Sequence, residues 1–148
     1  MRVRADGAWR EVEGGQVYVA GAWRQLSEAR AYISGAWETV ATFIPSLSLE
    51  ITPTLVGASI TGAGVATSNA ATATPTGGSA PFTYSWARVG GVSGSPNSPT
   101  NATTTFFKTL GNGDETSELF RCTCTDSFGT TATADIPVTF NSIFIGGE

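Results

Sequence analysis

A Gly-Ala-Trp tripeptide recurs three times near the N-terminus, and successive copies are fourteen residues apart. The copies are GAWR at residues 7–10, GAWR at 21–24 and GAWE at 35–38. They contain three of the four tryptophans of the 148-residue chain. A fixed spacing of this kind indicates one structural unit used repeatedly, so it restricts the fold of this region more than any other feature.

Each repeat predicts a short β-hairpin. A small apolar arm leads to a turn-forming residue and then Gly, which supplies a positive φ without steric cost. Ala-Trp, two polar residues and an aliphatic residue follow the turn. The turn pairs are Asp6-Gly7, Ala20-Gly21 and Ser34-Gly35. Residues 2–43 are therefore predicted to form a six-strand meander of three hairpins.

The loop length decides which residue lies opposite each tryptophan. A two-residue loop places a cationic or aromatic residue there, and such pairs contribute roughly 0.2–1 kcal/mol each to a hairpin. The pairs are Arg4 with Trp9, Tyr18 with Trp23, and Tyr32 with Trp37. A three-residue loop with a glycine bulge would instead place Val17 opposite Trp23. The sequence leaves both registers open.

A fourteen-residue hairpin cannot bury its own apolar face, so each one has to pack on a neighbour or on another chain. Two interpretations of the three tryptophans follow from this. They form the core of the N-terminal module, or they complete a contact with another subunit, where aromatic and arginine side chains often dominate the binding energy. The candidate contact residues are Trp9, Trp23, Trp37, Arg4, Tyr18 and Tyr32.

The repeat pattern stops at FIPSLS, which indicates a domain boundary near residues 44–46. Beyond it, runs rich in Thr, Ala and Val alternate with glycine-containing turns, as in a β-sandwich. The predicted strands are 47–52, 54–60, 65–74, 82–89, 103–109, 117–125 and 130–140. The predicted fold class is all-β, with a β-hairpin repeat module at 1–44, an immunoglobulin-like β-sandwich at 45–141 and a C-terminal tail at 142–148.

Details of this region favour the immunoglobulin-like topology. The segment PFTYSWARV alternates aromatic residues on one face and places Trp86 where the central strand of such a sandwich has its core tryptophan. Phe120 precedes Cys122 by two residues, where antibody-type domains usually have a tyrosine. The predicted core residues are Trp86, Tyr84, Phe120 and Cys122. Because segment 65–74 has no cysteine, the inter-sheet disulfide of antibody domains cannot form, and packing alone is expected to hold the core.

Residues 47–140 resemble the immunoglobulin-like or PKD-like modules appended to tail and other surface proteins of tailed bacteriophages. The resemblance rests on ATATPTGGSAPFTYSW, SPNSPTNATTTFF and FRCTCTDSFGTTATADIPVTF, although the family often has Val at the position of Cys124. The Gly-Ala-Trp hairpins likewise resemble short repeats near the ends of phage tail-associated proteins. Together the two resemblances cover nearly the whole chain.

The resemblance implies a non-enzymatic structural protein of a phage virion, made in the host cytoplasm without a signal peptide and present in multiple copies. The hairpins are expected to contact tail or capsid subunits, and the sandwich is expected to face the host surface or its polysaccharide. Two alternatives remain open. One is a capsid decoration or head-fibre protein, and the other is a carbohydrate-binding module whose tryptophans stack on sugar rings.

The composition argues against catalysis. The chain has no histidine, which excludes Ser-His-Asp and Cys-His arrangements. Asp114, Glu115 and Glu118 lie beside a Gly-Asn-Gly turn and are predicted to be in a solvated loop. A calcium site there is possible, but the alternating ligands of a calcium loop are missing. Cys122 and Cys124 are two residues apart on one strand, too poorly placed to bridge each other, and are expected to be reduced core thiols. No enzyme activity, metal or cofactor is expected.

The charge pattern restricts the partners. The net charge is −4, and the sequence has no stripe of basic residues that could follow the phosphates of a nucleic acid, so a nucleic-acid partner is not expected. No apolar run is long enough to span a bilayer, so membrane insertion is not expected either. The C-terminal FNSIFIGGE is apolar, and it is expected to pack on its own sandwich or to dock on another surface.

Overall fold

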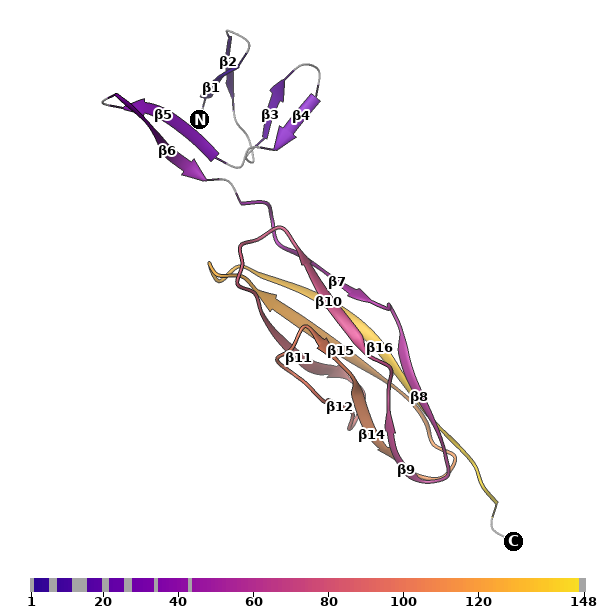
Figure 1. The fold of residues 1–148 in the computed structure, drawn as a ribbon. Helices are drawn as coiled ribbons and strands as arrows, with labels where there is room; N and C mark the ends of the chain where they lie inside the picture. Colours follow the sequence, from indigo (N-terminus) through magenta and orange to yellow (C-terminus); the bar gives the residue numbers. More distant parts are fainter. Residues whose placement is uncertain are drawn as a thin grey trace. The chain divides into compact units, whose positions relative to one another are not determined.

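Hydrogen-bonded strands make up all the regular structure of the described residues (Figure 1). The structure is a computed structural model and describes residues 2–5, 8–11, 16–19, 22–25, 28–33, 35–42 and 44–146. The chain divides into two compact units, Met1–Ser46 and Leu47–Glu148. The sequence predicts this boundary at residues 44–46. The predicted all-β class is confirmed.

The first unit contains three separate two-stranded antiparallel sheets. They are β1 (Arg2–Ala5) with β2 (Ala8–Glu11), β3 (Gln16–Val19) with β4 (Ala22–Gln25), and β5 (Glu28–Ile33) with β6 (Ala36–Thr42). The residues that lie opposite each other are Arg4 and Trp9, Tyr18 and Trp23, and Tyr32 and Trp37. This is the register of a two-residue loop. Val17 lies opposite Arg24, so the alternative pairing of Val17 with Trp23 is wrong.

The second unit is a β-sandwich. Its strands are β7 (Ser48–Thr52), β8 (Val56–Thr61), β9 (Gly64–Thr67), β10 (Ala71–Thr76), β11 (Thr83–Gly90), β12 (Ser95–Pro96), β13 (Thr103–Thr104), β14 (Phe106–Leu110), β15 (Glu115–Thr125) and β16 (Thr131–Ile143). One sheet has the order β11-β15-β16-β8, in which β8 runs parallel to β16. The other layer consists of β13-β10-β7 and β12-β14-β9, which are antiparallel.

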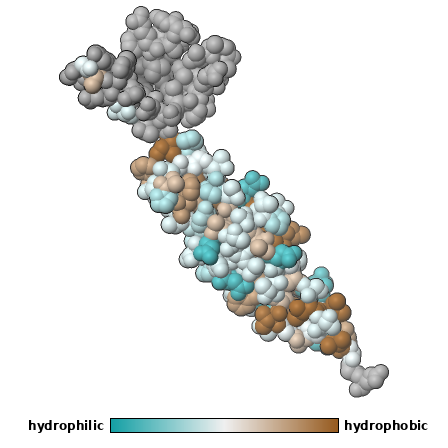
Figure 2. All heavy atoms as spheres, in the orientation of Figure 1, coloured by the Kyte–Doolittle hydropathy of each residue, from teal (hydrophilic) through white to brown (hydrophobic). Residues whose placement is uncertain are grey.

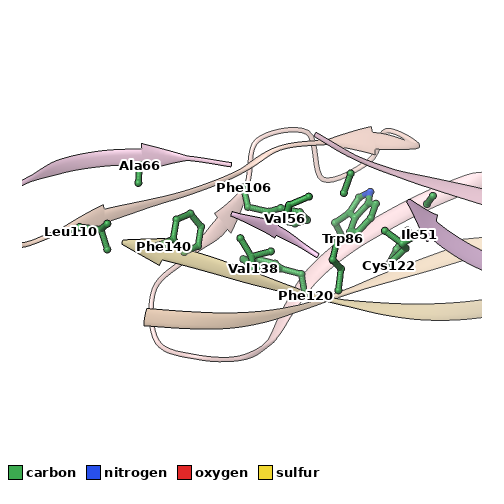
Figure 3. Packing of buried hydrophobic residues seen from close by; sticks show 13 residues of the cluster. Ile51, Val56, Ala66, Trp86, Phe106, Leu110, Phe120, Cys122, Val138 and Phe140 are labelled. Atoms are coloured by element: carbon green, nitrogen blue, oxygen red, sulfur yellow. The ribbon is translucent and has the colours of Figure 1, made fainter. Parts of the chain in front are cut away.

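The core lies between these layers and receives side chains from both (Figure 3). The ring of Trp86 meets Phe106 edge-on at 5.6 Å between centroids, and Phe106 lies 4.3 Å from Phe120. The indole Nε1 of Trp86 donates to the carbonyl of Asn101 at 2.9 Å, so this buried donor is satisfied. Three of the four predicted core residues, Trp86, Phe120 and Cys122, are buried, and Tyr84 packs against them half-buried.

Two predicted strands change partner midway, so the prediction of single continuous strands at 65–74 and 103–109 is wrong. Segment 65–74 pairs with β14 as β9 and then with β7 and β13 as β10. Segment 103–109 is divided at Thr105 in the same way, into β13 and β14. The physical reason is a local exchange of hydrogen bonds at Ser68. Its Oγ, in place of a backbone carbonyl, accepts the N–H of Phe106 at 3.0 Å, so the backbone pairing of β9 with β14 ends here, and the residues from Ala71 on pair with β7 and β13.

The last strand is longer than its prediction. β16 continues through Ile143, three residues past the expected end at 140, and Phe140 is fully buried in the core. The two-residue strand β12 lies between the predicted strands 82–89 and 103–109, where no strand is predicted. It pairs with β14 and covers the end of that layer.

Candidate functional site

The six candidate contact residues occupy equivalent backbone positions in the three hairpins. Each tryptophan follows the turn at the same register position, and the partners Arg4, Tyr18 and Tyr32 also correspond. The side chains of all six residues lie outside the described part of the structure. What the tryptophans contact therefore stays a prediction.

No group of three or more metal-ligating side chains occurs in the described ranges. Asp114 is exposed in the turn that precedes β15, and Glu115 is exposed at the first position of that strand. Glu118 is not, because it points inward from β15 and is only 2% exposed. The prediction that all three carboxylates lie in one solvated loop is therefore wrong for Glu118.

Glu118 forms a buried ion pair with Lys108 of β14, and the two strands belong to opposite layers. The Lys108 Nζ donates to Glu118 Oε1, and the backbone N–H groups of Val92 and Ser93 donate to the same oxygen at 3.2 and 3.3 Å. Burial alone would raise the pKa of Glu118, but these donors stabilise the carboxylate and lower its pKa below the ordinary value. The core is thus held by more than packing, and the sequence-based expectation is wrong on this point.

The loop that follows β11 packs closely against this carboxylate. Gly91 has a φ of +92°, and a Cβ at this position would overlap Oε2 of Glu118. A Cβ on Gly94 would lie 3.2 Å from Cγ of Glu118. Because both glycines touch the acid and two loop N–H groups point inward to it, the Val92 side chain is directed outward and is 80% exposed.

Three other exposed residues lie on the adjacent strands β11 and β15. A register shift between β11 and β15 lies at Val89, which is 47% exposed. Leu119 lies opposite Gly90, close enough that a Cβ on Gly90 would be 3.1 Å from its own Cβ. The guanidinium of Arg88 reaches the Gly94 carbonyl at 3.5 Å.

At the end of the sandwich next to the C-terminus, three consecutive apolar residues are more than half exposed. They are Ile143, Phe144 and Ile145. The side-chain amide of Asn112 accepts the N–H of Ile145 at 3.0 Å and donates to its carbonyl at 2.9 Å. The tail therefore contacts the turns of its own sandwich while its side chains stay accessible, and brown side chains gather at this end in Figure 2.

The turn between β15 and β16 presents Phe128, which is 71% exposed. The Asp126 carboxylate beneath it accepts the N–H groups of Phe128, Thr130 and Ser79 at 2.9, 2.8 and 3.2 Å. Burial would raise the pKa of Asp126, but these hydrogen bonds lower it overall. Asp126 thus fixes the turn through three hydrogen bonds, and the Phe128 ring is exposed to solvent.

The two thiols are unpaired and buried. Burial is the main cause that raises the pKa of Cys122 to about 12 and that also raises the pKa of Cys124. A buried thiol with a raised pKa has little thiolate at neutral pH and is therefore a poor nucleophile. Both residues act as small core side chains.

No family model and no curated protein matches the chain. The solved ASH / PapD-like domain of human CEP192 (PapD-like domain 7) is similar with a TM-score of 0.57 and 9% identity, over 72% of this chain and 93% of that one. The N-terminal four Ig domains of Dscam1 isoform 8.4 reach a TM-score of 0.42 and 15% identity, over 95% of this chain and 36% of theirs. The first likeness shows an immunoglobulin-like or PapD-like β-sandwich, and it concerns the fold alone. The described residues contain no helix that is long and apolar enough to cross a membrane.

Proposed function

We propose that this chain is a non-enzymatic structural protein of a phage virion, tail-associated and present in multiple copies. Its hairpins attach the chain to other virion subunits, and its sandwich is displayed to the host surface. The observation that carries the proposal is the common register of the three hairpins, which gives Trp9, Trp23 and Trp37 equivalent backbone positions. A partner built of repeated subunits would meet the same hairpin more than once, and linked weak contacts of this kind add up to strong attachment.

The separation of the hairpins into three sheets supports the same interpretation. Each sheet has two strands of four to seven residues. Isolated two-stranded hairpins are marginally stable in water, so packing against a partner would contribute to their stability. The sandwich has its own buried core and an inter-sheet ion pair, as expected for a module that is exposed on a particle.

Incorporation into particles tests the proposal. The full chain and a triple variant, Trp9→Ala with Trp23→Ala and Trp37→Ala, would each be supplied to a phage that lacks its own copy. Quantitative mass spectrometry of purified particles would then count the chain. We expect the triple variant to be lost from particles, whereas Phe128→Ala, which removes an exposed ring from the sandwich, stays incorporated.

Retention of the triple variant at the wild-type copy number would contradict attachment through the hairpins. Labelling of the sandwich with gold-conjugated antibody locates the chain on the particle. Label at the tail supports the proposal, and label over the head would replace it with the capsid decoration or head-fibre protein. A chain that is missing from purified particles would overturn the virion role altogether.

A further inference from the structure

The turn between β14 and β15 carries an asparagine whose side chain holds the C-terminal tail. Oδ1 of Asn112 accepts the N–H of Ile145 at 3.0 Å, and Nδ2 donates to the carbonyl of the same residue at 2.9 Å. A neighbouring antiparallel strand offers a residue the same two bonds, so the amide takes the place of a strand here. Within the described residues, the tail beyond Ile143 forms no other hydrogen bond. We call this pair of bonds the tail clamp.

The tail clamp depends on an amide group at position 112. It uses a donor and an acceptor on two atoms of one group, which the amides of Asn and Gln supply. An aspartate in this place would offer acceptors alone, and one of its oxygens would face the carbonyl oxygen of Ile145. Loss of Nδ2 from Asn112 therefore replaces a hydrogen bond with a contact between two acceptors, which is unfavourable.

The turn itself depends on glycine at the next position. Asn112 and Gly113 are its two central residues, and Gly111 and Asp114 close it through hydrogen bonds in both directions. Gly113 has a φ of +82°, at which a side chain would be strained. The tail and the turn together thus specify an Asn-Gly pair. The sequence has no other, because the remaining four asparagines are followed by alanine or serine.

An Asn-Gly pair is the least hindered site for loss of a side-chain amide, since glycine has no side chain to shield its nitrogen. Asn112 and Gly113 are both exposed, and the Gly113 N–H forms a long hydrogen bond of 3.3 Å to Ser142 Oγ. Asparagine is among the thermolabile residues of proteins. We propose that Asn112 is a site of spontaneous deamidation and that this reaction releases the C-terminal tail from the sandwich.

Water is the only co-reactant that the reaction needs. The Gly113 nitrogen loses its proton and attacks Cγ of Asn112, the Cγ–Nδ2 bond breaks, and ammonia leaves with the proton, which gives a cyclic succinimide. Water then opens one of the two imide carbonyls. Opening at Cγ gives aspartate, and opening at the backbone carbonyl gives isoaspartate, in which the chain runs through Cγ. Both products lack Nδ2, so neither restores the tail clamp.

The released tail carries two large apolar side chains. Ile145 and Phe144 are seated on turns, where a Cβ on Gly62 would lie 2.6 Å from Cδ1 of Ile145 and one on Gly113 would lie 3.4 Å from Cδ2 of Phe144. Once the clamp is lost, these packing contacts alone hold the two residues, although both are already more than half exposed. The apolar surface at this end of the sandwich would thus change with the age of the protein. The inference does not depend on where the protein acts.

Ageing of the full chain at mildly alkaline pH tests the chemical step. Peptide mass spectrometry follows the conversion of each asparagine with time. We expect Asn112 to convert at least about fivefold faster than Asn69, which is also exposed but is followed by alanine. Equal conversion of the two residues, or an unchanged Asn112, would overturn the proposal.

Chymotrypsin cleavage after Phe144 tests the release of the tail, because cleavage follows the population of the open form. We expect the aged chain and a freshly prepared Asn112→Asp variant to lose residues 145–148 about fivefold to tenfold faster than the fresh wild-type chain. Asn112→Gln keeps an amide but cyclises far more slowly, so its cleavage rate should not change with age. Asn69→Asp makes the same charge change away from the tail and should be cleaved like the wild type.

Far-UV circular dichroism confirms that each variant retains the sandwich. Equal cleavage of Asn112→Asp and the fresh wild-type chain would show that the amide does not hold the tail. Ageing that speeds cleavage of Asn112→Gln as much as that of the wild type would show that another change releases it. Either result would overturn the proposal.

Discussion

Lys108 and Glu118 form an ion pair that joins the two layers of the sandwich through its interior. Antibody-type domains link their layers with a disulfide, which this chain cannot form because its two cysteines lie on one strand. The ion pair is not an equivalent link, because both charges had to be removed from water. Removal of either partner would leave the other charge buried and unpaired, which would destabilise the fold. Glu118 in addition fixes the loop at 91–94.

Removal of one partner of the Lys108–Glu118 pair should lower the free energy of unfolding. Lys108→Met keeps the apolar stem but leaves the Glu118 carboxylate buried without its cation, and we expect a loss of about 3–5 kcal/mol in the free energy of unfolding. Urea unfolding of the full chain, followed by far-UV circular dichroism, measures it. Arg121→Met removes a cation from the half-exposed pair with Asp135 and should have a much smaller effect. Equal losses in the two variants would show that the buried pair has no special role.

Gly91 should tolerate alanine far less than Gly129 does. Both have a positive φ, +92° and +82°, so both substitutions incur backbone strain of about 1–2 kcal/mol. A Cβ at Gly129 meets nothing within 4 Å, whereas one at Gly91 overlaps the carboxylate of Glu118. We expect Gly91→Ala to lose at least about 1 kcal/mol more than Gly129→Ala, because the displaced carboxylate loses hydrogen bonds. Similar thermal unfolding midpoints for the two variants would contradict the contact.

Acid should destabilise the sandwich. The folded-state pKa values of Glu118, Asp126 and Asp135 are all lowered. A carboxyl group with a lowered folded-state pKa contributes stability above its unfolded pKa of about 4, and this contribution is lost as the pH falls through the folded value. We expect the free energy of unfolding to be nearly constant between about pH 6 and 8 and to fall below about pH 4.5. Asp126→Asn should reduce the slope in acid, and an unchanged slope would mean that this carboxyl group has no lowered pKa.

The buried thiols should resist alkylation. With the pKa of Cys122 raised to about 12 and both thiols inaccessible, iodoacetamide at about pH 8 should leave the folded chain unmodified. After unfolding in urea, the intact mass should increase by two carbamidomethyl groups. Rapid modification of the folded chain at either thiol would show that the β15 core is open to solvent.

The sequence contained enough information for the fold class and for several positions. Residue types at turns predicted the three hairpins, because the Gly of each repeat can supply the positive φ of a tight turn, but they left the register open. The spacing of Trp86, Phe120 and Cys122 predicted core residues, since alternation along a strand assigns the inward face without knowledge of the partner strand. Local patterns of this kind are sufficient wherever the relevant contact lies within one strand or one hairpin.

Features that depend on contacts between distant residues were missed. Nothing in the Thr-Ala run around Ser68 signals that the chain changes sheets there, because the deciding hydrogen bond comes from Phe106, far along the chain. The sequence pattern predicts a loop position for Glu118, because its neighbours Asp114 and Glu115 are acidic and a Gly-Asn-Gly turn precedes them. The signal that could have found it is the strand alternation, which puts Glu118 on the same face as Phe120 and Cys122.

The central claim is that the hairpin tryptophans are contact residues that await a partner. Acrylamide quenching of the tryptophan fluorescence of the free full chain, at a concentration where it is monomeric, tests this claim most directly. Trp86 is 3% exposed and serves as an internal protected reference. The account predicts one blue-shifted, protected tryptophan and three red-shifted, easily quenched ones. Four protected tryptophans in a monomer would mean that Trp9, Trp23 and Trp37 form the core of their own module, and this would contradict attachment through them.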